Sequence, residues 1–324
     1  MLPLFSFNFS FFAFGAALLV ALIADHYLGE PPVRLHPVVW MGNFLDWASM
    51  RLQPKASPII RDLRSFWLAA AFWCAGAAMV LIVAYAVQWA AVQLPWYLAV
   101  VLLGLTLKPM LAWAMLRSEV AAVEVALGES LDAGRQRLAM LVSRDTANLN
   151  ESEVRESAIE SLAENLNDSV VAPIFWFVLF GLPGAAIYRF ANTADAMWGY
   201  RGLRNGKNWE WAGKWAARAD DLLSWLPARI TALLLVLISG GIRLQKLSEE
   251  ARKTPSPNSG WPMAAMALAL GVRLQKPGVY VLNASGRSPE PKDTVFAQKN
   301  ASKVVVACAI WAQAATYLTA FLKP

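Results

Sequence analysis

Cysteine and histidine are both scarce in this sequence. Only two cysteines and two histidines occur among 324 residues, and Cys74 and Cys308 each lie inside an apolar run. A disulfide framework and a Cys-rich zinc site both need closely spaced sets of cysteines, so this scarcity excludes them. Ordinary apolar packing is the role we expect for both thiols.

Charge is scarce as well, at 16% of residues against 57% hydrophobic residues and 15 Trp. This composition indicates an integral membrane protein. Three apolar runs, 66–87, 96–115 and 304–322, approach the ~20 residues that a membrane-spanning helix needs. No Lys, Arg or cleavage motif precedes the N-terminal run, which predicts a retained signal anchor. Shorter apolar runs occupy residues 11–24, 170–190 and 226–241. The expected fold class is all-α, a polytopic helical membrane protein forming a single domain over residues 1–324.

The sequence lacks the basic stripe of nucleic-acid-binding proteins and the P-loop motif of nucleotide-binding proteins. The Trp residues gather in or beside apolar runs, with no continuous basic stripe, so we expect no nucleic-acid partner. The segment 202–208, GLRNGKN, lacks both the spacing and the Ser or Thr of a P-loop. It is interpreted as a turn with basic residues, with Lys207 touching phosphate as the alternative.

The loops predict the topology. Arginines after residue 30 place the first loop in the cytoplasm, and the uncharged connection 88–96 is expected to be external. The run 170–190 is interrupted by Pro173, Gly181, Pro183 and Gly184, which predicts a broken or re-entrant segment lining a protein cavity. For the run 226–241 as well, the sequence leaves open whether the segment spans the membrane or folds back.

Two cytoplasmic segments carry opposite charge. Residues 116–168 hold 5 Lys/Arg against 11 Asp/Glu, whereas residues 243–303 hold 10 against 4. The first is expected to be helical and the second to form a loop or lid, with a short amphipathic helix at about 262–270. Together they could hold a metal–nucleotide complex or an anionic substrate. They could also attract each other, or the basic segment could bind anionic lipid.

The acidic segment contains a patterned helix. Asn150 with Glu153 has the form of a capping box, so a helix should begin near Glu151. Its buried stripe is predicted at Val154, Ala158, Leu162 and Leu166, while another face is a ladder of acids and amides (Glu153, Glu156, Glu160, Glu164 and Asn167). Like charges four residues apart repel, and a helix C-terminus disfavours acids, so a cation should offset them. A solvated acidic face is the simpler reading.

Two Asn-x-x-Asp pairs flank the broken run. Asn165 and Asp168 lead into it, and Asn192 and Asp195 follow it. If the run folds back, the pairs would form opposite walls of one polar site at the membrane boundary, where polar groups are costly unless they bind something. Alternatively, Asn192 caps the next helix and Asp195 lies in its first turn.

Other polar residues are candidates with structural alternatives. Asp25 and His36 either enter the site from the end of the first helix or stabilise a Pro-rich turn. Arg144 and Asp145 form either a capping turn or an anion contact. In RADDLLSWLPAR, Asp220 and Asp221 suit Mg²⁺ and the flanking Arg218 and Arg229 suit phosphate, unless they simply begin a helix.

Several of these motifs resemble one family. SRDTANLNESEVRESAIESLAENLNDSVVAP, NTADAMWGY, AARADDLLSWLPAR and SPNSGWPMAAMALALGVRLQ, with ADHYLGEPP and HPVVWMG upstream, are similar to the CobD/CbiB family of cobalamin biosynthesis, the adenosylcobinamide-phosphate synthases. The likeness extends over about residues 24–285 in the family order. Small substitutions at Ser143, Ser169, Ala194 and Ala196 depart from the family pattern beside the polar positions.

The resemblance implies a multi-pass enzyme of the bacterial inner membrane with its site facing the cytoplasm. Such an enzyme is a carbon–nitrogen ligase that joins cobyric acid to aminopropanol, its phosphate or ethanolamine phosphate, using ATP and Mg²⁺ or another divalent cation. Expected partners besides these substrates are membrane lipids and either a second copy or other corrinoid-pathway enzymes. The catalytic candidates are Glu160, Glu164, Asn165, Asp168, Asn192 and Asp195. The substrate-binding candidates are Asp25, His36, Arg144, Asp145, Arg218, Arg229 and Asn258, and the metal-binding candidates are Asp220 and Asp221.

Two other functions remain open. A membrane prenyltransferase-like enzyme acting on lipid phosphates also places acids at the mouth of a helical bundle, but Asn167-Asp168 and Asp220-Asp221 each lack the further Asp of its motifs. A non-catalytic membrane sensor related to the family is the other alternative. ATP consumption that depends on cobyric acid and aminopropanol phosphate separates all three.

Overall fold

The computed structural model describes residues 7–52, 61–204 and 206–321 and is almost entirely helical. The chain divides into two compact units. The first contains residues 1–111, 172–223 and 311–324, and the second contains residues 112–171 and 224–310. Both oppositely charged segments, 116–168 and 243–303, fall within the second unit.

The first unit is a bundle of apolar helices with a short hairpin. Ala17 and Ala21 of α1 are fully buried, and a Cβ on Gly104 of α4 would come within 2.6 Å of Val20, so small residues let these two helices approach closely. Within the segment 202–208, Leu203–Arg204 and Lys207–Asn208 pair as short antiparallel strands, which agrees with the predicted turn. The elements of the first unit are α1 (Phe7–Leu28), η1 (Val33–Leu35), α2 (Pro37–Leu52), α3 (Leu63–Val92), α4 (Trp96–Leu107), η2 (Lys108–Met110), α8 (Ala172–Trp198), β1 (Leu203–Arg204), β2 (Lys207–Asn208) and α9 (Trp209–Ala212).

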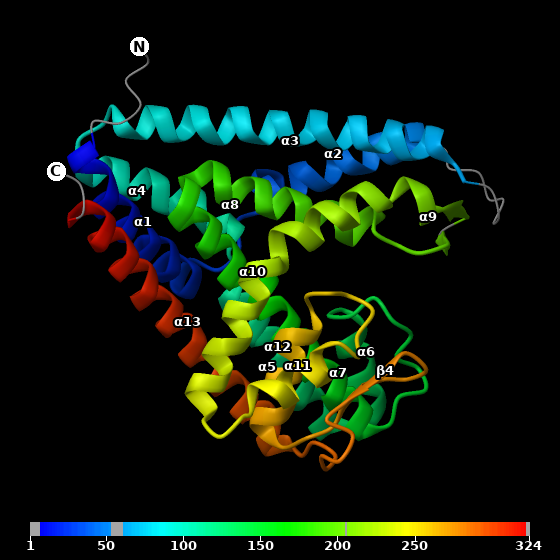
Figure 1. Cartoon of the computed structure of the whole chain (residues 1–324). Coiled ribbons are helices and arrows are strands. Elements are labelled where there is room, and N and C mark those ends of the chain that lie inside the picture. The colour runs from blue at the N-terminus through cyan, green and yellow to red at the C-terminus, as the bar shows by residue number, and fades with distance from the viewer. Residues whose placement is uncertain (1–6, 53–60, 205, 322–324) are drawn as a thin grey trace. The chain divides into compact units, whose positions relative to one another are not determined.

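The second unit gathers shorter helices and a second hairpin; Figure 1 shows α5, α6, α7, α11, α12 and β4 together. Its elements are α5 (Trp113–Glu129), α6 (Leu131–Ala139), α7 (Glu151–Leu166), the π-helical turn η3 (Asn167–Val171), α11 (Leu244–Ala251), α12 (Gly260–Leu270), β3 (Leu274–Lys276) and β4 (Tyr280–Leu282). Helices α10 (Lys214–Ser239) and α13 (Pro291–Phe321) contribute residues to both units.

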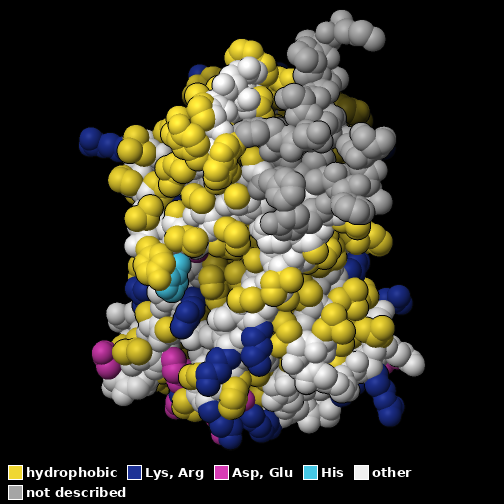
Figure 2. Space-filling view, turned by 90° about the vertical axis from the view of Figure 1, so that its left-hand side faces the viewer, with side chains coloured by type: hydrophobic (Ala, Val, Ile, Leu, Met, Phe, Trp, Pro, Cys, Tyr) yellow, Lys and Arg dark blue, Asp and Glu magenta, His cyan; other side chains and the backbone are white. Residues whose placement is uncertain are grey.

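Four helices are long and apolar enough to cross a membrane among the described residues: 63–92, 96–129, 151–198 and 214–239. They contain the apolar runs 66–87, 96–115 and 170–190, and the run 226–241 as far as residue 239. Residues 13–28 form a shorter apolar helix. The run 304–322 lies in α13, which is not one of the four, and its last residue lies outside the described part of the chain. Figure 2 shows exposed hydrophobic side chains across the visible face. The chain is thus a polytopic all-α membrane protein, as predicted.

Helix α8 is broken at Gly181, as the sequence predicts. Gly181 has φ 68° and ψ −153°, a conformation open essentially only to glycine. The backbone then turns back, because a Cβ on Gly184 would come within 2.2 Å of the carbonyl oxygen of Trp176, eight residues earlier. A straight helix would separate these residues by about 12 Å. The side-chain oxygen of Gln88 accepts a hydrogen bond of 2.8 Å from the N–H of Leu182, one of the donors that the break releases.

Helix α7 begins and packs as predicted but does not end as predicted. Its capping box between Asn150 and Glu153 is present, and Val154, Ala158, Leu162 and Leu166 are buried. After Leu166, however, the chain passes through the π-helical turn directly into α8. No helix C-terminus therefore lies beside Glu164 or Asp168, so the dipole penalty expected there is wrong, and desolvation is the cost that remains.

Three further expectations need correction. Asn192 and Asp195 lie near the end of α8, so Asn192 does not cap a following helix. Helix α12 is buried over most of its length instead of amphipathic. Cys308 is buried as expected, whereas Cys74 is exposed on α3.

Candidate functional site

The acidic face of α7 is buried in the second unit. The side chains of Glu156 and Glu160 are 0% and 1% exposed. A buried carboxylate must be paired or must lose its charge, because removal from water disfavours the ionised form. The reading of this face as a solvated surface is therefore wrong for these two residues.

Each of the two buried carboxylates has an arginine partner from another segment. Arg144, which precedes α7, lies 2.8 Å from Glu160, and Arg273, which precedes β3, lies 3.3 Å from Glu156. These pairs supply the cations that the ladder requires. The pair of Arg273 with Glu156 also brings the basic segment onto the acidic one within a single unit, which is one of the arrangements expected from the charges.

The β3–β4 hairpin adds a lysine and a tyrosine to this face. Lys276 interacts electrostatically with Glu160 and Glu164. Burial, reinforced by the carboxylates of Glu160 and Glu164, raises the pKa of the Tyr280 phenol, so this hydroxyl stays protonated and able to donate. Neither Lys276 nor Tyr280 was identified from the sequence. The only available signal was their place in a basic segment expected to act as a lid.

Four buried atoms of this cluster have no hydrogen-bond partner within the described part of the chain. They are Oε2 of Glu156, Oε1 of Glu160, Nη1 of Arg144 and Nε of Arg273. Buried polar atoms are almost always satisfied by protein, water or ligand. Two acceptors and two donors without partners, beside paired charges, are suited to binding a polar molecule. We call Arg144, Glu156, Glu160, Glu164, Arg273, Lys276 and Tyr280 the carboxylate cluster.

A polar connection extends from the end of α7 to α10. The amide of Asn167 donates to Asp168 at 2.7 Å, and its oxygen accepts from the hydroxyl of Thr231 at 3.1 Å. Asn165 donates instead to the carbonyl of Ser161, one turn back on its own helix. Asp168 therefore lies at one end of the polar face, and α10 lies against that end.

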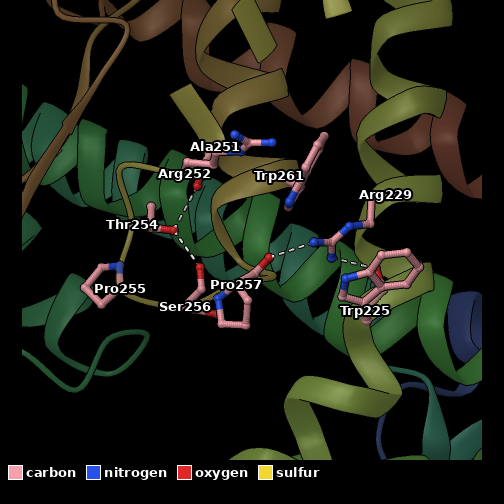
Figure 3. Close-up of a pocket in the computed structure, with 9 residues that line it drawn as sticks. All are labelled: Trp225, Arg229, Ala251, Arg252, Thr254, Pro255, Ser256, Pro257 and Trp261. Atoms are coloured by element: carbon pink, nitrogen blue, oxygen red, sulfur yellow. Dashed lines mark hydrogen bonds between the residues drawn. The ribbon is translucent and has the colours of Figure 1, made fainter. Parts of the chain in front are cut away.

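The Arg229 side chain holds the loop that precedes α12 (Figure 3). It donates to the carbonyl of Trp225 and the side-chain oxygen of Asn258, both at 2.7 Å, and to the carbonyl of Pro257 at 3.1 Å. The guanidinium also lies over the rings of Trp225 and Trp261. Arg229 and Asn258, far apart in the sequence, are thus in direct contact.

This loop borders a pocket of about 550 Å³. Its lining residues come from α10, from the end of α11, from the loop itself and from the start of α12: Trp225, Arg229, Ala251, Arg252, Thr254, Pro255, Ser256, Pro257 and Trp261. The pocket and the carboxylate cluster share the second unit. Met263 of α12, two residues beyond Trp261, contacts the hydroxyl of Tyr280 at 3.8 Å.

The remaining candidates of the second unit form a turn. The carboxylate of Asp145 accepts a hydrogen bond of 2.9 Å from the N–H of Ala147, which is the capping-turn alternative predicted for it. Its neighbour Arg144 points to Glu160, so the two adjacent residues have different roles.

The other candidates belong to the first unit. The amide of Asn192 donates to Asp220 at 3.5 Å, and Arg189 donates to Asn192 at 3.4 Å. Arg218 is exposed on α10. Because Asn192 and Asp195 lie in one unit and Asn165 and Asp168 in the other, their predicted meeting stays a prediction.

A metal site at Asp220 and Asp221 is only partly suited by their geometry. Consecutive helical residues point about 100° apart, so one ion does not easily bind both from one side. No group of three His, Cys, Asp or Glu side chains arranged for a metal occurs among the described residues. One carboxylate with phosphate oxygens from a substrate would still suit Mg²⁺.

Asp25 and His36 belong to a buried ion cluster that the sequence did not reveal. Lys108, which is 4% exposed, lies 3.5 Å from Asp25 and 2.8 Å from Glu30, and His36 lies 3.1 Å from Glu30. Lys108 was missed because it is a single cation at the end of an apolar run. Its burial beside two acids depends on the packing of α1 against α4.

Comparison with known proteins gives a consistent result. The model of the family described as CobD/Cbib protein matches residues 18–310. A probable cobalamin biosynthesis protein CobD of Methanothermobacter thermautotrophicus is 41% identical over 283 residues, which are 82% of this chain and 86% of that protein. The protein with the same description from Thermococcus kodakarensis is 42% identical over 276 residues, 85% and 86% of the two chains.

A bacterial relative and the solved structures complete the comparison. The cobalamin biosynthesis protein CobD of Brucella anthropi is 34% identical over 302 residues, 86% of this chain and 90% of that protein. No solved structure gives a significant match. The match of the family model, which covers most of the chain, agrees with the motifs on α7, α10 and the loop before α12, and the chain belongs to the CobD/Cbib family of cobalamin biosynthesis proteins.

Proposed function

We propose that the protein is an ATP-dependent carbon–nitrogen ligase that joins a carboxyl group of (adenosyl)cobyric acid to the amine of aminopropanol or its phosphate. Ethanolamine phosphate is the related acceptor, and the product is (adenosyl)cobinamide or its phosphate. The observation that carries this proposal is the carboxylate cluster, in which buried acids of α7 face Arg144, Arg273 and Lys276.

The reaction needs two steps that such a cluster can support. Transfer of the γ-phosphoryl group of ATP to the substrate carboxylate oxygen gives an acyl phosphate and ADP. The amine nitrogen then attacks the acyl carbon, a C–N bond forms, and inorganic phosphate leaves with the electron pair of the C–O bond. Because an amine is an ammonium ion at neutral pH, a base must first take its proton. Glu164 or Asp168 is our candidate for that base, because both carboxylates lie on the acidic face where α7 passes into the π-helical turn.

Positive charge is needed while phosphate is transferred and released. Arg144 and Lys276 lie beside Glu160 and can stabilise the oxygens that gain negative charge. The buried Tyr280 hydroxyl can donate to the same oxygens. A divalent cation would arrive with ATP and neutralise its phosphates. Of this chain's residues, Asp220 or Asp221 would hold it through one carboxylate.

We place the protein in the cytoplasmic membrane, the inner membrane of a bacterium, with the second unit and its cluster facing the cytoplasm. The basic residues of 243–303 support this orientation, because positively charged loops remain on the cytoplasmic side. Membrane lipids are then its surroundings, and a second copy or another corrinoid enzyme would be a partner.

The test measures ADP release by the full-length protein purified in detergent. We expect ADP only when cobyric acid and aminopropanol phosphate are both present, together with an amide product identified by mass. Ethanolamine phosphate in place of aminopropanol phosphate tests the choice of amine. The triple variant Glu160→Gln, Glu164→Gln, Asp168→Asn should lose the reaction. ADP release that does not need cobyric acid, or wild-type turnover by the triple variant, would contradict the proposal.

A further inference from the structure

The pocket beside Arg229 has cations on its walls but no acid. Arg229 and Arg252 are its two charged residues, and no carboxylate lines it in the described part of the chain. The neighbouring Lys253 is instead neutralised by Glu250 at 2.8 Å. Two guanidinium groups without a carboxylate favour an anionic ligand, because two like charges at one pocket are stabilised by an opposite charge.

The two arginines are not equivalent. Arg229 has both N–H groups of Nη1 and one of Nη2 engaged by oxygen atoms of the protein. It keeps two N–H donors, at Nε and Nη2, and its stacking between Trp225 and Trp261 holds it in place. Arg252 is exposed at the edge of the pocket and has all of its donors available for a ligand.

The rest of the wall is flat and apolar. Trp225 is 54% exposed, so much of its indole surface is open, and Pro255 and Pro257 are exposed on the loop opposite (Figure 3). Exposed indole faces favour planar rings, whose stacking on an aromatic side chain is favourable. A simple phosphate ion would not stack on these apolar walls, and a lipid chain would not pair with the arginines.

The loop also offers neutral hydrogen-bonding groups. The Ser256 oxygen accepts from the N–H groups of Asn258 and Ser259, both at 3.2 Å, so its own hydroxyl hydrogen is left for another acceptor. The volume of about 550 Å³ lies within the roughly 300–1,000 Å³ range of small-molecule sites.

We propose that this pocket binds a nucleoside triphosphate, with the base stacked against Trp225 and the phosphates held by Arg252 and the remaining donors of Arg229. The proposal rests on the proposed function in that ATP is the co-substrate of the ligation. It assigns a place for ATP to residues that the sequence analysis did not single out, namely Trp225, Arg252 and Ser256. The carboxylate cluster, in the same unit, is then left for the corrinoid carboxylate and the amine.

Binding is measured on the full-length protein in detergent with mant-ATP, a fluorescent ATP analogue excited by energy transfer from tryptophan. Trp225→Ala should weaken mant-ATP binding about tenfold or more through loss of stacking. Arg252→Gln should weaken competition by ATP and by inorganic triphosphate but leave competition by adenosine unchanged. Matched controls are Trp211→Ala, which removes an indole that contacts Lys214 in the first unit, and Arg243→Gln, which removes an exposed cation of the same basic segment.

Photolabelling with 8-azido-ATP locates the site independently of any variant. We expect the label on peptides that contain Trp225 or residues 252–261, with protection by ATP. A label elsewhere, or unchanged affinity in both pocket variants when their thermal unfolding is like that of the wild type, would overturn the proposal. Displacement of mant-ATP by cobyric acid alone, or by vesicles of phosphatidylglycerol but not by ATP, would overturn it as well.

The outcomes for the ligation and for the pocket are separable. If ATP consumption depends on cobyric acid and the amine but the pocket variants bind mant-ATP normally, the ligation stands and the pocket assignment fails. If mant-ATP binds at Trp225 but no amide product forms with any of the amines, the pocket assignment stands and the proposed reaction fails.

Discussion

The pair formed by Arg144 and Glu160 allows folding and chemistry to be separated. Its two charged groups are 2.8 Å apart, and Glu160 is 1% exposed while Arg144 is 19% exposed. Arg144→Ala leaves a buried carboxylate without its closest cation, which typically costs about 3–5 kcal/mol. Because Lys276 and Tyr280 also act on Glu160, we expect a loss of about 3 kcal/mol, at the lower end of that range.

Glu160→Gln should behave differently. The amide keeps the shape and an acceptor oxygen for Arg144, and the unpaired charge is then on the more exposed partner. We expect a loss of about 1.5 kcal/mol in the free energy of unfolding, at the lower end of what one hydrogen bond to a charged group contributes. Loss of turnover should nevertheless be severe, because the carboxylate itself is removed from the cluster.

The assay combines thermal unfolding of the detergent-solubilised protein with ADP release in the presence of both substrates. The matched control is Glu124→Gln, which breaks the ion pair of 2.9 Å between Glu124 and Arg155, two residues of the same unit that are not members of the cluster. It should lower stability without lowering the turnover of the folded fraction. If Glu160→Gln retains wild-type turnover, or destabilises the protein as much as Arg144→Ala, the reasoning is refuted.

Three further predictions concern the two units separately. Gly181→Ala places a methyl group within 2.2 Å of the side-chain oxygen of Gln88 at a φ of 68°, so it should destabilise the protein by at least the roughly 1–3 kcal/mol of such backbone strain. Thermal unfolding measures this loss, and the control is Gly128→Ala, which adds a methyl group in open space on α5. An unchanged unfolding midpoint for Gly181→Ala would contradict the break in α8. Lys108→Met removes the lysine beside the buried Asp25 and the half-buried Glu30, and should destabilise the protein by about 3–5 kcal/mol. The control Lys246→Met, at an exposed lysine, should have no effect, and equal unfolding midpoints for the two variants would exclude the ion cluster. Burial alone would raise the pKa of Asp293, but hydrogen bonds from Arg287 and the N–H of Glu290 outweigh burial and hold the pKa below its usual range. The ionised carboxylate therefore stabilises the folded protein above its unfolded pKa of about 3.9. This stabilisation is lost as the pH falls through the lower pKa of the folded state. Asp293→Asn should accordingly be less stable than the wild type near pH 6, with a difference that shrinks below pH ~4, and a difference independent of pH would contradict this.

Local sequence patterns determined much of the helical structure. The capping box at Asn150, the buried stripe of α7, the break at Gly181 and two of the three predicted long apolar helices, 63–92 and 96–129, follow from short-range rules. Capping, backbone conformation and hydrophobic length all depend on neighbouring residues. The motifs on α7, α10 and the loop before α12 also sufficed to identify the family, since they retain its order along the chain.

Only the tertiary structure decided which charges meet. The sequence contains the acids of α7 and an excess of basic residues in 243–303, yet pairing Glu156 with Arg273 joins residues 117 positions apart. The same applies to Arg229 with Asn258 and to Lys108 with Asp25. Long-range ion pairs depend on how helices pack and on how deeply each side chain is buried, and neither is encoded in the spacing of residues along one helix. Burial turned a ladder that could have been a solvated face into a candidate site, because the cost of desolvating a carboxylate requires a partner that a local pattern does not specify.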